Sequence, residues 1–151
     1  MNAKRSQAML RLPRDQTPAV ITTQDGERAD VYLFVPPGEN VAQVLDDPEP
    51  FVAVIYSAGV RLVARSTIAC ITVRETHAVA DDGDLPVERQ KATVRLRTGG
   101  SVAGELRWTA PPGRRRTLDH LNEPSTHLVV HGGGETSYVA KAHVASVSEE
   151  G

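Results

Sequence analysis

The tripeptide Pro36-Pro37-Gly38 occurs a second time as Pro111-Pro112-Gly113, at an offset of 75 (111 minus 36). Thr23 recurs as Thr98 at the same offset, and one inserted residue downstream raises the offset to 76. A colinear series of matches of this length indicates an internal duplication. At the offset of 76 the identical pairs are Leu45 and Leu121, Pro48 and Pro124, Val54 and Val130, Val63 and Val139, Ala64 and Ala140, and Ala69 and Ala145, and the similar pairs are Asp46 and Asn122, Asp47 and Glu123, Arg65 and Lys141, Ile68 and Val144, and Ile71 and Val147.

Both halves of the chain begin with a pattern that is typical of a β-hairpin. Residues 19–23 and 29–35 are rich in β-branched and aromatic side chains, and they flank the turn-forming pair Asp25-Gly26. The counterparts in the second half are residues 92–97 and 102–108, around Gly99-Gly100-Ser101. In the first of these, Val94 and Leu96 alternate with Arg95 and Arg97, which predicts a strand whose arginines point to solvent.

Short helices and further strands follow in each half. Residues 39–45 and 114–121 have room for one or two helical turns before a proline stops them. We interpret Gly132-Gly133-Gly134 as a hairpin turn rather than a phosphate-binding loop, because it joins two strands and does not open a helix. The remaining expected strands are residues 51–57, 61–65 and 68–73 in the first half and residues 127–131, 137–141 and 143–147 in the second.

This spacing of short strands is typical of a small barrel or sandwich unit. The expected fold is therefore mainly β, with two similar small barrel-like halves that lie in tandem and pack together. Packing two such units buries apolar surface that each alone is too small to cover. The expected organisation is a flexible basic N-terminal segment (1–16), a first β repeat (17–74), an acidic connector (75–90) and a second β repeat (91–148).

Composition excludes several classes of protein. The 151 residues are 40% hydrophobic, 24% charged and 4% aromatic, so the core must be built mainly from Val, Ala, Leu and Ile. A single cysteine, Cys70, excludes an internal disulfide and a cysteine-rich zinc site, and a net charge of -2 excludes a strongly basic nucleic-acid-binding chain. Apolar stretches such as residues 51–56 are too short to cross a bilayer, and residues 1–5 lack the apolar run of a signal peptide. We therefore expect a cytoplasmic protein without membrane insertion.

The strongest local charge feature is the arginine loop, which we define as Arg114, Arg115 and Arg116. Arginine binds phosphate and carboxylate groups in two-point geometry, so this loop is the candidate site for an anionic partner. The alternative is a solvated loop whose arginines pair with nearby carboxylates. Asp119 and Asn122 are expected to shape the loop and to cap backbone amides.

Catalytic and metal-binding chemistry has little support in the sequence. His127 and His131 lie four residues apart on one face of a strand, and with Glu135 they form a weak candidate for a zinc site, although no recognised metal motif is present. Cys70 lies in the apolar run Ile68 to Ile71, which favours a small buried side chain over a nucleophile. We therefore expect no enzyme activity and no cofactor.

The second half carries a resemblance to a known type of domain. Leu118-Asp119-His120-Leu121-Asn122 is followed by a strand around Leu128-Val129-Val130 and then by the segment 138–144. This order resembles a group of small bacterial β domains of uncharacterised function, whose layout is similar to that of Sm-like and SH3-like barrels. The first half departs from the pattern, because Gln43 and Asp46 stand where the second has Asp119 and Asn122. The resemblance implies a module for binding or assembly.

Two functions remain open at this point. The first is a non-enzymatic protein-interaction or assembly module, a scaffold or adaptor whose exposed sheet edges bind a protein partner or further copies of itself as an oligomer. The alternative is a binder of nucleic acid or of a nucleotide second messenger that uses the arginine loop, and such binding would weaken steeply with added salt. Trp108 and Tyr138 are the only aromatic residues in the second half, which disfavours a reader of single-stranded RNA.

Overall fold

The computed structural model describes residues 16–74, 87–113 and 115–151. The expectations for the basic N-terminal segment, for most of the acidic connector and for Arg114 lie outside these residues. The first half contains β1 (Gln16–Thr23), β2 (Arg28–Phe34), α2 (Val41–Asp46), β3 (Phe51–Tyr56), β4 (Gly59–Ala64), the 3-10 turn η2 (Arg65–Thr67) and β5 (Ile68–Arg74). The second contains β6 (Val87–Leu96), β7 (Ser101–Thr109), α3 (Thr117–Leu121), β8 (His127–Gly132), β9 (Glu135–Ala140), η3 (Lys141–His143) and β10 (Val144–Glu149).

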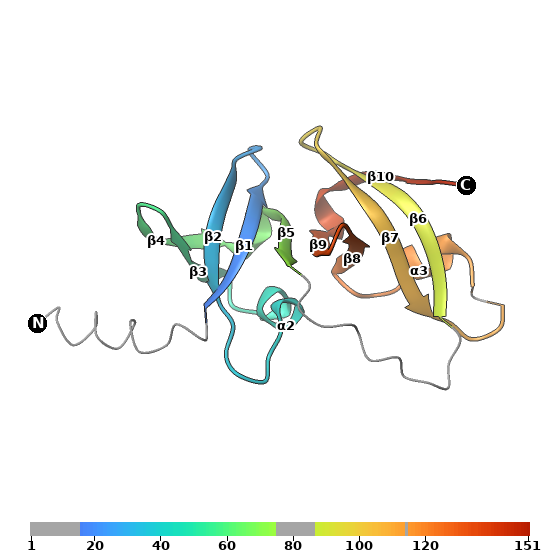
Figure 1. Ribbon diagram of the computed structural model, residues 1–151, viewed down its shortest axis with the longest axis horizontal. Coiled ribbons are helices and arrows are strands. Elements are labelled where there is room, and N and C mark those ends of the chain that lie inside the picture. Colours follow the sequence, from blue (N-terminus) through green and yellow to red (C-terminus); the bar gives the residue numbers. More distant parts are fainter. Residues whose placement is uncertain (1–15, 75–86, 114) are drawn as a thin grey trace, which may run out of the picture.

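The protein is mainly β, as the sequence predicts, and the expected strands are found with small shifts at their ends. The order of elements in residues 16–74 recurs in residues 87–149 (Figure 1). Turn chemistry is also confirmed: β8 and β9 form a hairpin in which Gly133 and Gly134 adopt φ values of +62° and +75°. Only glycine adopts such a conformation without strain, which explains the run of glycines there.

All described strands belong to one antiparallel sheet, in the order β10-β6-β7-β8-β9-β5-β1-β2-β3-β4. The prediction of two barrel-like halves packed together is thus corrected in part, because the sheet is continuous and does not close into a barrel. β5 pairs with β1 of its own half on one side and with β9 of the other half on the other side, so the halves join edge to edge. Residues 87–90 of the predicted connector also belong to the sheet, because they pair with β7.

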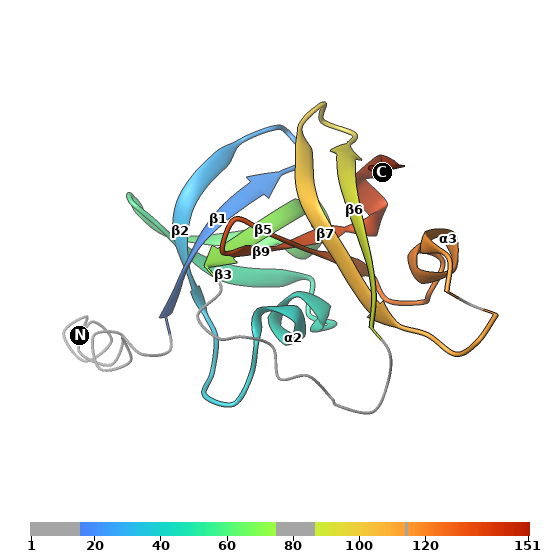
Figure 2. The ribbon, with the colours of Figure 1, turned by 45° about the vertical axis from the view of Figure 1, so that its right-hand side comes forward.

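Two apolar clusters form the core, one in each half, and β5 contributes to both. Figure 2 shows β5 beside β9, where the halves meet. The first cluster gathers residues of β1, β2, α2 and β3 together with Ile68 and Ile71 of β5. The second gathers residues of β6, β7, β8 and β9 together with Ala69 and Cys70 of β5. Cys70 and Ile71 are consecutive residues of β5, so they point to opposite faces and enter different clusters. Arg95 and Arg97 are exposed, as predicted.

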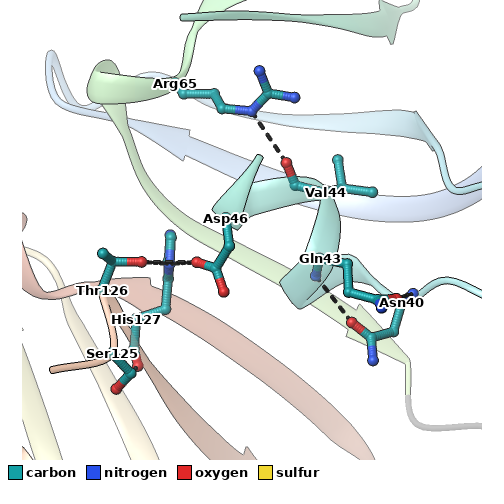
Figure 3. Close-up of polar contacts among 8 residues, drawn as sticks. All are labelled: Asn40, Gln43, Val44, Asp46, Arg65, Ser125, Thr126 and His127. Carbon is teal, nitrogen blue, oxygen red and sulfur yellow. Dashed lines mark hydrogen bonds and ion pairs between the residues drawn. The ribbon is translucent and has the colours of Figure 1, made fainter. Parts of the chain in front are cut away.

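The helix α2 is short and is held at both ends. Asn40 accepts a hydrogen bond from the backbone N–H of Gln43 at 3.0 Å, and Gln43 accepts one from the N–H of Asn40 at 2.8 Å, which is a capping box (Figure 3). At the other end, Arg65 Nε donates to the carbonyl oxygen of Val44 at 3.1 Å.

No helix in the described ranges is long and apolar enough to cross a bilayer.

The strand β7 has a neighbouring strand on each side, and it approaches the second one, β8, beside Gly104. It pairs with β6 from Val87 opposite Thr109 onward, and it meets β8 where Glu105 lies opposite His131. A Cβ atom at Gly104 would lie 2.5 Å from the carbonyl oxygen of His131 and 2.8 Å from Val130 Cγ1. These distances are shorter than van der Waals contacts, so the close approach of β7 and β8 requires glycine.

We predict that Gly104→Ala destabilises the protein by about 1–3 kcal/mol, because the added methyl group must push two packed strands apart. The matched control is Gly100→Ala, where the nearest atom to the new Cβ, Thr98 Oγ1, would be 3.9 Å away. Urea denaturation of both variants measures the difference. Equal free energies of unfolding for the two variants would contradict the prediction.

Candidate functional site

The described arginines of the arginine loop face carboxylates. Arg116 Nε and Nη2 donate to the two oxygens of Asp119 at 3.2 and 3.1 Å, and Asp119 also accepts the backbone N–H of Arg116 at 3.1 Å. Arg115 Nε lies 3.9 Å from a carboxylate oxygen of Glu88. Asp119 therefore caps a backbone amide, as expected, and Asn122 follows the last residue of α3. An anionic ligand would have to compete with these carboxylates for both arginines.

An aromatic pair lies beneath α3. Trp108 and His120 stack with their rings 4.8 Å apart and 6° from parallel. Trp108 is only 7% exposed, and among the described residues neither its Nε1 nor His120 Nδ1 has a hydrogen-bond partner. The nearest carboxylate oxygen of Glu123 is 3.8 Å from His120 Nδ1, too far for a hydrogen bond. The tryptophan is therefore buried in the core and does not present its face as a base-stacking platform.

Burial lowers the pKa of His120 below its ordinary value of 6.5 and outweighs the opposing effect of Glu123. The folded protein consequently binds fewer protons at this site than the unfolded chain does. We predict that the free energy of unfolding falls as the pH drops from about 7 towards 5, and that His120→Gln shows a shallower fall. Denaturation curves over this range measure both slopes, and a slope that the substitution leaves unchanged would contradict the assignment.

The candidate metal ligands do not converge. His127 and Glu135 lie at opposite ends of the β8–β9 hairpin, because His127 is opposite Ala140 and Glu135 is opposite Gly132. His127 Nδ1 instead lies 3.1 Å from Asp46 Oδ1 and 2.9 Å from Thr126 Oγ1 (Figure 3). Within the described ranges no three metal-ligating side chains gather at one place. His127 thus takes part in a polar contact between the two halves.

Cys70 is buried, and burial outweighs the opposing effect of the Arg28 charge on its pKa. Its side chain is part of the second core cluster, with Sγ 3.7 Å from Thr72 Oγ1. Burial raises the pKa of the Cys70 thiol above its ordinary value, so little thiolate is present near neutral pH. This environment is that of a structural cysteine.

We predict that Cys70 reacts with a thiol reagent at least about ten times more slowly in the native protein than in the denatured chain, because its residue is only 4% exposed and its pKa is raised. A spectrophotometric thiol assay with and without denaturant gives both rates, and Cys70 is the only thiol of the chain. Rapid labelling of the native protein would indicate an activated, accessible thiolate and contradict this environment.

The halves meet along β5 and β9, which we call the junction. Its register runs from Cys70 opposite Val139 to Arg74 opposite Glu135. The hydroxyl groups of Thr72 and Ser137 form a hydrogen bond of 2.7 Å across it. A cleft of about 380 Å³ opens over the junction and is lined by residues of both halves, including these two hydroxyl residues.

Two polar contacts flank the junction on other elements. Asp46 at the end of α2 accepts a hydrogen bond of 2.7 Å from Thr126 Oγ1 and also lies beside His127 (Figure 3). His143 Nε2 of η3 donates to the carbonyl oxygen of Ser66 in η2 at 2.7 Å. The halves are therefore connected by a strand pairing, two separate side-chain contacts and a shared core.

The strands at the two edges of the sheet are β4 and β10. Among the described residues β4 pairs only with β3, and β10 pairs only with β6. The two edges lie on opposite sides of the molecule (Figure 1). Next to the β4 edge, Phe51, Val60 and Leu62 are 60%, 47% and 73% exposed. These three side chains share one face of the β3–β4 hairpin, because Phe51 is opposite Ala64 and Val60 is opposite Ile55.

Sequence reasoning named exposed edges only in general and did not identify these apolar residues as a site. Alternation in β3 and β4 is weak, and an edge strand cannot be distinguished from a central strand by its composition alone. No protein-family model, curated protein or solved structure matches the chain. The argument for function therefore rests on the geometry above.

Proposed function

We propose that the chain is a non-enzymatic protein-interaction or assembly module that binds through the open edges of its sheet. The observation that carries this proposal is that β4 and β10, among the described residues, each pair with another strand on one side only, with Phe51, Val60 and Leu62 exposed beside β4. An unpaired edge presents a row of backbone N–H and C=O groups that can accept another strand. Exposed apolar side chains beside that row would add buried area to the contact.

Residues 17–74 and 91–148 are, in this proposal, diverged copies of one small unit of the Sm-like or SH3-like type. The recurring order of elements supports this, as does the offset of 76 that relates β3, β4 and β5 to β8, β9 and β10. Edge pairing between such units is already used once within the chain, at the junction.

Binding of nucleic acid or of a nucleotide at the arginine loop has weaker support. Arg116 is engaged by Asp119, Arg115 lies near Glu88, and Trp108 is buried beneath α3. A phosphate group would gain the arginines only at the expense of these ion pairs. Strand pairing at the edges of the sheet does not require these ion pairs to be broken.

The proposal is tested with tagged full-length chains in extracts of the cells that produce them. We predict that the wild type migrates on a native gel in a complex larger than the 16.3 kDa chain, and that Leu62→Lys shifts it towards the size of one chain. A lysine at this exposed position leaves the fold intact but cannot be buried cheaply in an interface. The matched control is Val87→Lys, at a residue that is 39% exposed at the start of β6, outside the stretch from Ala92 to Leu96 that pairs with β10.

Two results would contradict the proposal. One is a wild-type chain that migrates as a monomer in the extract. The other is a complex that Leu62→Lys leaves intact, which would place the binding surface elsewhere. Circular dichroism of the purified variants establishes that they are folded.

A further inference from the structure

The junction within the chain shows how one edge of this sheet accepts another. At the offset of 76, β4 corresponds to β9 and β10 corresponds to β5. The chain therefore pairs the β9 edge of its second half with the β5 edge of its first half, and no strand of residues 16–74, 87–113 or 115–151 covers the equivalent edges, β4 and β10.

The side chains at the junction explain why this pairing is favourable. Tyr138 of β9 lies opposite Ile71 and packs against the core cluster of the first half, not of its own half. In return, Ala69 and Cys70 of β5 are buried in the core cluster of the second half. Each of the two strands thus covers the neighbouring core with one of its faces.

The same exchange is available to the open edges. Leu62 stands at the position equivalent to Tyr138 and is 73% exposed, so it lacks the neighbouring core that buries its counterpart. Val147 stands at the position equivalent to Ile71 and is partly buried against the second core cluster. Ala145 and Ser146, equivalent to Ala69 and Cys70, are exposed. The residues that the junction buries from each side therefore have exposed counterparts on β4 and on β10.

We propose that the partner of this module is a second copy of the same chain, added head to tail so that β4 of one copy pairs antiparallel with β10 of the next. This inference rests on the proposed function and names its partner. The register of the junction, transferred by the offset, places Leu62 opposite Val147, Val63 opposite Ser146, and Arg61 opposite Ser148.

Charge and flanking contacts agree with this register. Glu150 becomes the diagonal neighbour of Arg61, two residues beyond Ser148 on the same face, which is a favourable cross-strand pair. Phe51 and Asn122 are equivalent to His127 and Asp46, which touch across the junction. The exposed ring of Phe51 therefore comes to lie against the end of α3 in the next copy.

The contact is heterologous, because two different surfaces meet. Each added copy again leaves one β4 edge and one β10 edge open. Such an assembly grows until it closes into a ring, or it continues as a filament. The ten-stranded sheet of one chain is in this view a segment of a longer sheet made from repeated, similar junctions.

The test uses the purified full-length chain. Analytical ultracentrifugation over a wide range of concentrations is expected to show species heavier than one chain, and Leu62→Lys is expected to remove them while Val87→Lys keeps them. Register is tested by mixing an Arg61→Cys chain with a Ser148→Cys chain under mild oxidation. A disulfide-linked dimer is expected from the mixture, because facing residues on paired strands lie close enough to be bridged.

The controls distinguish this arrangement from other forms of association. Neither cysteine variant alone forms the dimer, and a Val87→Cys chain mixed with Ser148→Cys does not form it either. The native Cys70 is buried and is retained in all of these variants. Symmetric association through one edge would instead cross-link a single variant with itself, and it would overturn the head-to-tail arrangement.

The outcomes also separate this inference from the proposed function. A purified wild-type chain that remains monomeric at every concentration overturns the second-copy partner. If the complex in the cell extract is still lost with Leu62→Lys, the edges bind a different protein and the proposed function stands. If the extract also holds only monomer, both fall.

Discussion

The pairing of β5 with β9 is the interaction on which the rest of the structure depends. It makes one continuous sheet from two runs of strands, and it gives each core cluster side chains from the other half. Each half is short for an independent domain, because a chain of about 60 residues buries a smaller fraction of its surface on folding than a larger domain does. Tyr138 of the second half packs beside Ile71 in the first core, and Cys70 of the first half packs beside Val139 in the second core. Each core is thereby enlarged by side chains of the other half.

Because β5 pairs with β9, the two edges of the continuous sheet are formed by β4 and β10. Natural edge strands are commonly protected by charges, prolines or bulges that oppose further pairing. β4 carries a single charged residue, Arg61, which lies over the ring of Tyr56 and pairs with Glu27, while Val60 and Leu62 are exposed. An edge of this composition has little of that protection. The junction shows a pairing geometry that such an edge can adopt.

The arginine loop shows that a local run of charge does not reveal which groups surround it in the fold. Three consecutive arginines are visible in the sequence, but the carboxylates near the two described ones come from different places. Asp119 is three residues from Arg116, and the sequence suggests that pair. Glu88 approaches Arg115 only because β6 runs beside β7, a proximity that no local pattern contains. The contact of His127 with Asp46 is likewise a product of the junction.

Local patterns in the sequence were sufficient for the elements of this protein. β-branched runs predicted the strands, the run Gly132-Gly133-Gly134 predicted the turn between β8 and β9, and the repeated spacing predicted the recurring order of elements. They were not sufficient for the choice of neighbours within the sheet. Backbone N–H and C=O groups are the same on every strand, so hydrogen bonding alone does not specify that β5 should pair with β9. Burial of Tyr138 and Cys70 in the opposite cores favours that pairing, and burial is a property of the assembled tertiary structure.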